Sequence, residues 1–176
     1  VAGALEKEHN GEICVTDSYE NIFAKDLKSY RQKLTLEELL KQKEEQSQRG
    51  LEAEEFVLEL ERNRLPLKAY KIKRISDFDV AAGYDIVSYD SNESMKYDRF
   101  IEVKCYLGKP HFYWSENECD TARQKGSKYI LCLVDYTRIK EPGYTPQYIR
   151  NPYDDIFTNE NWLVNAASYK IQEISN

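Results

Sequence analysis

The chain has 176 residues and a formal net charge of -6, with 41% hydrophobic and 32% charged residues. This length suits one domain with a sizeable core and an appended segment. The acidic balance argues against a protein that binds nucleic acid by bulk electrostatics, and no apolar run reaches the roughly 20 residues of a membrane span.

Charge and cysteine are unevenly distributed along the chain. Residues 66–140 carry a net charge of +2, whereas the segments before and after them carry -5 and -3. The four cysteines show no C-x-x-C spacing, which argues against a common zinc site. Cys105 and Cys132 lie in apolar patterns and are interpreted as small core residues, a usage that suits a reducing compartment and predicts a cytoplasmic protein.

The N-terminal part reads as a helical or linker segment over residues 1–48, followed by a domain over residues 49–176. Thr35 and Glu38 have the spacing of a capping box, which predicts a helix start. Gly50 is expected to interrupt the helical pattern, and a second helix is expected to run from there to about Arg64.

The second predicted helix carries one acid of interest, Glu54. Ala53, Phe56 and Val57 follow helical spacing and mark the buried face. Glu54 then falls on the flank of that face, where it can look into a cleft, while Glu55 lies nearly opposite it. The alternative is that Glu54 is a solvated glutamate on an acid-rich helix.

Residues 66–76 alternate apolar and basic side chains, which predicts a strand with a basic face. Lys71, Lys73 and Arg74 on that face are candidates for contacts with nucleic-acid phosphates. Lysines on an edge strand also guard against aggregation, and the sequence leaves both interpretations open.

The segment Gly83–Tyr106 organises the chain. Residues 83–87 and 100–106 read as two strands, joined by a polar, turn-prone stretch, and most simply pair as a hairpin. Ile101, Val103 and Cys105 share one face of the second strand, so Glu102 and Lys104 share the other. With Asp85 on the first strand, two acids and a lysine converge at one end of the hairpin, as in metal sites.

The remaining pattern completes an α/β protein with a mixed β-sheet flanked by helices. Ser115 and Glu118 form a second capping box, and Gly126 is placed to end the helix that it opens. The apolar run 129–136 predicts a strand buried on both faces. The other expectations are loops over 137–160, a short helix over 161–167 and a last strand over 168–174.

Four stretches together resemble a known family: Gly50-Leu-Glu-Ala-Glu-Glu-Phe-Val57, Gly83-Tyr-Asp-Ile86, Ile101-Glu-Val-Lys104 and Phe112-Tyr-Trp-Ser-Glu-Asn-Glu118. They are similar to the nuclease-like domain of the Protein NO VEIN C-terminal family, in the PD-(D/E)XK nuclease superfamily. The resemblance covers about residues 50 to 136 and implies a restriction-endonuclease-like αβββαβ core. It departs from the superfamily pattern in that Tyr84, not proline, precedes the aspartate.

The resemblance implies a Mg²⁺-dependent endonuclease domain that hydrolyses DNA, as part of a restriction or related defence system. Asp85, Glu102 and the Val103 carbonyl would hold Mg²⁺, with Mn²⁺ as a substitute, and Lys104 would orient the attacking water. Glu54 matches the family's G-x-x-x-E pattern and would join this catalytic set. Asn117, from an Asn-Glu pair in the family pattern, would contact nucleic acid.

Two other interpretations remain open for the same residues. The first is a nuclease-like module that binds nucleic acid or a partner protein without cleaving. The second is a structural ion-pair network of Asp85, Glu102 and Lys104. The acidic charge predicts that DNA is delivered with help from other domains or subunits, and the oligomeric state is left open, a homodimer included.

Overall fold

In a computed structural model the described residues are 5–7, 13–15, 35–79 and 81–165. The chain divides into two compact units, Val1–Glu44 and Glu45–Asn176. In the first unit, β1 (Leu5–Lys7) and β2 (Ile13–Val15) pair as an antiparallel two-stranded sheet. The predicted boundary between residues 48 and 49 and the observed division both fall within helix α2 (Leu36–Arg64).

Helix α2 begins at the predicted capping box and continues through Gly50, so the predicted interruption is wrong. The Thr35 backbone N–H donates to Glu38 Oε2 at 2.8 Å, and the Glu38 N–H donates to Thr35 Oγ1 at 3.2 Å. One helical glycine costs only about 1 kcal/mol, which the good helix formers around it offset. Within the described part of the chain, no helix has the length and apolarity that a membrane span requires.

The second unit is built on a five-stranded sheet, and the predicted mixed α/β fold is confirmed. Its strands follow one another in space as in sequence, in the order β3-β4-β5-β6-β7. All neighbours pair antiparallel except β5 and β6, which are parallel and are connected through helix α3 (Glu116–Lys125). The strands are β3 (Lys73–Arg74), β4 (Ile86–Ser88), β5 (Arg99–Tyr106), β6 (Tyr129–Asp135) and β7 (Gln147–Arg150).

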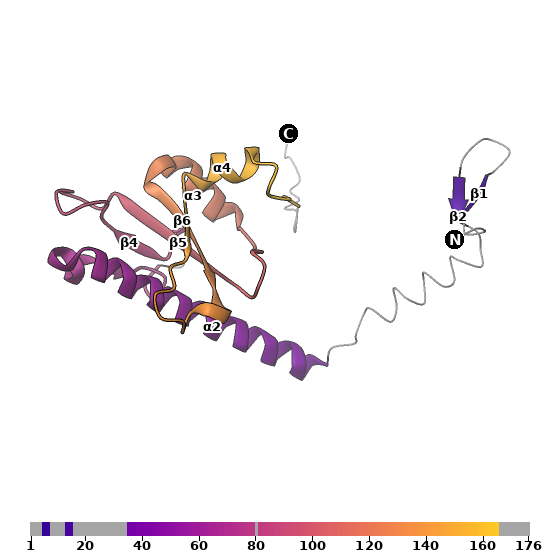
Figure 1. The fold of residues 1–176 in the computed structure, drawn as a ribbon, viewed down its shortest axis with the longest axis horizontal. Coiled ribbons are helices and arrows are strands. Elements are labelled where there is room, and N and C mark those ends of the chain that lie inside the picture. The colour runs from indigo at the N-terminus through magenta and orange to yellow at the C-terminus, as the bar shows by residue number, and fades with distance from the viewer. Residues whose placement is uncertain (1–4, 8–12, 16–34, 80, 166–176) are drawn as a thin grey trace, which may run out of the picture. The chain divides into compact units, whose positions relative to one another are not determined.

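Helices cover both faces of this sheet (Figure 1). On one face Ala53, Val57 and Leu58 of α2 pack in a cluster with Ile101 and with alternate residues of β6. Leu131 and Leu133 of β6 pack on the opposite face with Ile156 of α4 (Pro152–Thr158). Every residue of β6 is therefore buried, as predicted, because the period of two sends its side chains alternately into two cores.

The predicted hairpin is confirmed by the antiparallel pairing of β4 and β5, but other local predictions are wrong. Residues Pro66–Lys71 form a 3-10 helix, and only Lys73–Arg74 of the predicted strand 66–76 is extended. Proline at the first helical position favours this outcome because its φ is preset for a helical turn. The loops expected over 137–160 contain β7 and α4 and a 3-10 turn, Tyr136–Arg138.

At the C-terminal end, residues 161–165 are not helical, against the short helix predicted for 161–167. The strand predicted over 168–174 lies outside the described residues. Helix α3 starts at Ser115 with the predicted capping box, and Gly126 ends it at a φ of 52°, also as predicted. A 3-10 turn, Gly126–Lys128, then leads directly into β6.

A buried ionic cluster joins the C-terminal end of α2 to the hairpin. Glu61 is 1% exposed, and its carboxylate accepts from Ser88 Oγ at 2.8 Å and from Arg64 Nη2 at 2.6 Å. Arg99 at the start of β5 lies 3.1 Å from the same carboxylate. These partners satisfy the hydrogen-bonding groups of the Glu61 carboxylate, so this buried acid has a structural role. No pattern in the sequence indicated this role.

Gly83 places β4 against helix α3. Its φ is 72°, and a Cβ built there would lie 2.4 Å from Thr121 Oγ1 and 3.1 Å from the Asn117 carbonyl oxygen. Its own carbonyl accepts a hydrogen bond from the buried Tyr129 hydroxyl at 2.9 Å. Only glycine fits this conformation and this close approach without strain.

We therefore expect Gly83→Ala to lower the free energy of unfolding by about 2 kcal/mol, from the left-handed strain and the contact with Thr121. Urea unfolding followed by circular dichroism measures it. Gly50→Ala is the matched control: a Cβ there meets nothing within 4 Å, so this change should stabilise helix α2 by about 0.5–1 kcal/mol. Equal effects at the two glycines would contradict this account of Gly83.

Candidate active site

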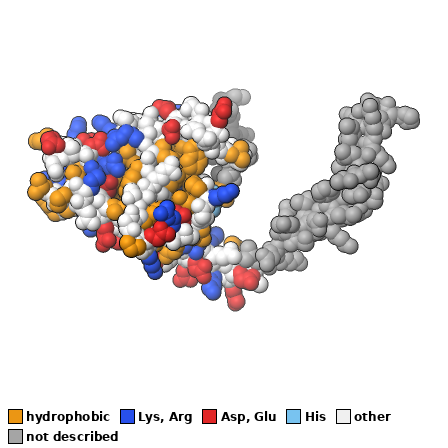
Figure 2. All heavy atoms as spheres, viewed as in Figure 1, with side chains coloured by type: hydrophobic (Ala, Val, Ile, Leu, Met, Phe, Trp, Pro, Cys, Tyr) orange, Lys and Arg blue, Asp and Glu red, His pale blue; other side chains and the backbone are white. Residues whose placement is uncertain are grey.

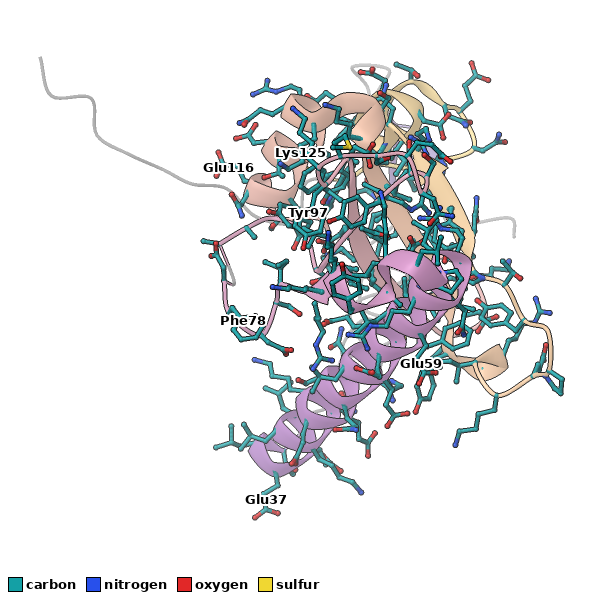
Figure 3. All side chains as sticks on the ribbon, turned by 90° about the vertical axis from the view of Figure 1, so that its left-hand side faces the viewer. Glu37, Glu59, Phe78, Tyr97, Glu116 and Lys125 are labelled. Atoms are coloured by element: carbon teal, nitrogen blue, oxygen red, sulfur yellow. The ribbon has the colours of Figure 1, made fainter. Side chains whose placement is uncertain are left out.

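A pocket of about 160 Å³ opens where the N-terminal end of β4, the middle of β5 and the start of α3 meet. Two connecting segments border it, the loop before Gly83 and the segment that leads into α3. Figure 3 shows the loop that carries Phe78 and the first turn of α3, marked by Glu116, on the same side of the molecule. The lining residues are Ser76, Asp79, Gly83, Tyr84, Asp85, Glu102, Ser115, Asn117 and Glu118.

Asp85 is fixed in this pocket by two hydrogen bonds to β5. Its backbone N–H donates to the Ile101 carbonyl at 2.9 Å, and its Oδ2 accepts from the Val103 N–H at 2.8 Å. At the point where the β4–β5 pairing ends, the carboxylate thus accepts the hydrogen bond that a backbone carbonyl of a neighbouring strand would otherwise accept. Burial raises the pKa of Asp85 to about 7, and the charge of Glu54 adds to this shift, although the Val103 hydrogen bond opposes it.

Glu102 is the most deeply buried acid of the pocket, with 4% of its surface exposed. It lies on β5 on the face away from Ile101 and Val103, which pack in the α2 core. Burial raises the pKa of Glu102 to about 8, and repulsion from the Asp85 carboxylate raises it further. At neutral pH the two acids therefore hold a proton that solvent-exposed carboxylates would have lost.

Lys104 bridges two carboxylates from different elements. Its Nζ lies 2.7 Å from Glu102 Oε1 and 2.8 Å from Glu118 Oε2, and 17% of its side chain is exposed. Burial alone would lower the pKa of this ammonium, but the two carboxylates outweigh burial and raise the pKa above its ordinary value. Lys104 is therefore a fixed positive charge at the edge of the pocket.

Glu54 faces this group of residues from α2, on the half-buried flank that the helical spacing predicted, whereas Glu55 is exposed. Its Oε2 accepts from Ser76 Oγ at 2.7 Å, which holds the side chain toward the pocket loop. Burial raises the pKa of Glu54, and the charges of Arg74 and Lys104 counteract this shift. The four predicted catalytic residues, Glu54, Asp85, Glu102 and Lys104, are thus brought together.

The donor set suits a hard divalent cation. The half-buried Asp85 lies close to the buried Glu102, and Lys104 contacts Glu102 and Glu118, with Glu54 nearby. Mg²⁺ is commonly bound by one or two carboxylates and keeps several waters. In the described ranges no three His, Cys, Asp or Glu side chains are grouped as a metal cage, so the protein would supply only the Asp85–Glu102 pair and a backbone oxygen.

The candidate nucleic-acid residues have different environments. Lys71 and Lys73 are exposed beside the pocket loop. Arg74 is paired with Asp77 at 2.9 Å and with Glu55 at 3.5 Å. Asn117 donates from Nδ2 to the Ala81 carbonyl at 3.0 Å and so ties the pocket loop to α3.

On the face of the molecule drawn in Figure 2, basic and acidic side chains are intermixed, and no extended field of one sign is visible. This agrees with the net charge of -6. Contacts to phosphate by Lys71, Lys73, Arg74 and Asn117 stay a prediction, and for Arg74 they would require exchange of an existing ion pair.

Sequence reasoning missed two parts of the site. Ser76 holds Glu54, but a serine beside a loop carries no signal of its own. Glu118 was interpreted as a cap, and it does cap α3, accepting from the Ser115 N–H at 3.1 Å. Its second contact, with Lys104, depends on the packing of α3 against the sheet and is not visible in local spacing.

A comparison with models of protein families matches residues 53–149 to the family described as Protein NO VEIN, C-terminal. The chain belongs to this family. The matched segment contains β4, β5, α3 and β6, and with them every residue of the pocket, so the NO VEIN C-terminal domain is the part of the chain that forms the site. Searches among curated proteins and among solved structures returned no match.

The raised pKa values predict that the acid pair destabilises the NO VEIN C-terminal domain as pH rises. Between pH 5 and 8 the folded chain keeps protons on Asp85 and Glu102 that the unfolded chain has lost, so stability falls as pH rises. Asp85→Asn removes one charge and keeps an acceptor for the Val103 N–H. We expect it to be more stable than wild type by about 1 kcal/mol or more at pH 8, and by less at pH 5.

Urea unfolding at several pH values measures this difference. Asp79→Asn is the matched control, because Asp79 lies at the exposed rim of the same pocket. If the stability of Asp85→Asn relative to wild type does not increase with pH, the pKa values of the acid pair are not raised in the folded chain.

Proposed function

We propose that this domain is a Mg²⁺-dependent endonuclease that hydrolyses phosphodiester bonds of DNA, with the PD-(D/E)XK type of active site, in a restriction or related defence system. The observation that carries the proposal is the under-neutralised acid pair: Asp85 and Glu102 share one pocket, and the ammonium of Lys104 is already divided between Glu102 and Glu118. Such a pair is costly to bury unless a cation joins it.

Asp85 and Glu102 would hold the metal, with the Val103 carbonyl as a further ligand and Mn²⁺ as a substitute. Bound Mg²⁺ supplies Lewis-acid stabilisation of the phosphoryl oxygens and lowers the pKa of a coordinated water. Asp85 is suited to its role because the Val103 N–H fixes one of its oxygens and leaves the other free of described partners. Glu102 likewise has only one oxygen on Lys104.

Lys104 would orient the attacking water and stabilise the negative charge that grows on the phosphate. Both tasks need a charge that is fixed before the reaction, because a preorganised group costs no rearrangement in the transition state. The burial of Lys104 and its two short contacts provide this. Glu54, held by Ser76, would position a second water or metal.

Substrate delivery would rely on other domains or subunits. The exposed lysines Lys71 and Lys73 offer a few phosphate contacts, but Arg74 is engaged by acids and the whole chain is acidic. Affinity for DNA grows with the number of phosphates neutralised, so two lysines alone support only weak binding.

A second candidate function is a catalytically silent module that binds nucleic acid or a partner protein. The observation in its favour is that Lys104 is saturated by Glu102 and Glu118, as in a structural ion-pair network. In that case the acids would stay with the lysine and would take up no divalent cation.

Cleavage of plasmid DNA with Mg²⁺ or Mn²⁺ tests the first proposal. We expect Lys104→Met, which keeps the length of the side chain, and Asp85→Asn to reduce cleavage at least about 100-fold, since each removes a charge that acts in the transition state. Lys41→Met removes a charge from an exposed position of α2 and should cleave like wild type. Full cleavage by both site variants would contradict the assignment.

A further inference from the structure

Glu118 takes part both in the N-terminal cap of α3 and in the ionic contacts of Lys104. Its Oε2 accepts from the Ser115 N–H at 3.1 Å, which closes the capping box of α3, and from Lys104 Nζ at 2.8 Å. Its own N–H donates to Ser115 Oγ at 3.2 Å, so the residue is held from both ends. One oxygen therefore connects the first turn of α3 to the lysine on β5.

The chain contains a second capping box that lacks this connection. Thr35 and Glu38 at the start of α2 make the same reciprocal bonds, at 2.8 and 3.2 Å. Among the described side chains, Glu118 takes part in a salt bridge and Glu38 in none. Capping accordingly accounts for the hydrogen bonds of both glutamates but not for the Lys104 contact.

The Lys104 contact determines where the ammonium can lie. A lysine has three donors on a flexible stem, and without a second acceptor it would be drawn wholly to Glu102, the nearest carboxylate. Glu118 gives the ammonium a second acceptor, on α3. The ammonium is thereby held between β5 and α3, in contact with two of the residues that line the pocket.

We propose that Glu118 is the positioning residue of the active site: its carboxylate, fixed by the cap of α3, holds Lys104 in the place from which it acts on the attacking water. This inference rests on the proposed nuclease function and adds a residue to it. Glu118 acts through Lys104 and need not touch the substrate. Loss of such a supporting contact typically costs about 10- to 100-fold in activity.

Glu118→Gln separates this role from capping, because glutamine also serves at this position of a capping box but carries no charge. We expect kcat for DNA cleavage to fall at least about 10-fold, with KM within about 3-fold of wild type and a melting temperature within about 2 °C. Glu38→Gln makes the same change in the box without a lysine, and its kcat should equal that of wild type.

Glu118→Asp gives a test of opposite sign. Aspartate keeps the negative charge, and the flexible Lys104 side chain can still reach it. Its shorter side chain, however, is less able to accept the hydrogen bond from the Ser115 N–H. Positioning predicts the kcat order wild type, then Glu118→Asp, then Glu118→Gln, whereas a pure cap predicts Glu118→Asp at or below Glu118→Gln. The second order would overturn the proposal, even where one of the variants also loses stability.

A readout independent of cleavage is the ¹H–¹⁵N signal of the Lys104 ammonium group, assigned by its loss in Lys104→Arg. Burial and two short hydrogen bonds protect this group from exchange with water, so its signal should move or broaden in Glu118→Gln and stay unchanged in Glu38→Gln. An unchanged signal and kcat in Glu118→Gln would overturn the positioning role alone. A wild-type chain that neither cuts DNA nor binds Mn²⁺ would overturn the proposed function instead.

Discussion

The placement of the half-buried Asp85 and the buried Glu102 in one pocket, beside a lysine that Glu118 shares, is the constraint on which the site depends. The chain contains another buried acid, Glu61, which obtains a serine hydroxyl and two arginines as partners. Asp85 has only the Val103 N–H as a described partner and Glu102 shares Lys104 with Glu118, and the pKa values of the two acids rise to about 7 and about 8. Glu61 therefore has a structural role, whereas acids with raised pKa values in a pocket are candidates for a functional site.

The fold around Asp85 and Glu102 tolerates the free-energy cost of placing two acids close together in a pocket. Strand β6 is buried on both faces and carries two hydrophobic cores, one shared with α2 and one with α4. The parallel neighbour β5 can therefore hold Glu102 and Lys104 on one face while Ile101 and Val103 on the other face stay in the core. Gly83 brings β4 close enough to α3 for both to border the same pocket.

The features that local pattern determines were predictable from the sequence. The period of two in β5 separates Glu102 and Lys104 from Ile101 and Val103, and helical spacing places Glu54 on a half-buried flank with Glu55 exposed. Both capping boxes were also visible. The helix break predicted at Gly50 is wrong because the strong helix formers around this glycine offset its cost. The contacts of Glu118 with Lys104 and of Ser76 with Glu54 could not be predicted, because each joins segments that are distant in sequence.

Calorimetric titration of Mn²⁺ into the wild-type chain tests the central claim most directly, when it is done at pH 6.5 in two buffers of different ionisation enthalpy. The account predicts saturable binding with release of about one to two protons per ion, because the metal must displace protons that burial holds on Asp85 and Glu102. Asp85→Asn should lose the binding. Absence of binding, or binding without proton release, would contradict the claim that this acid pair is a metal site.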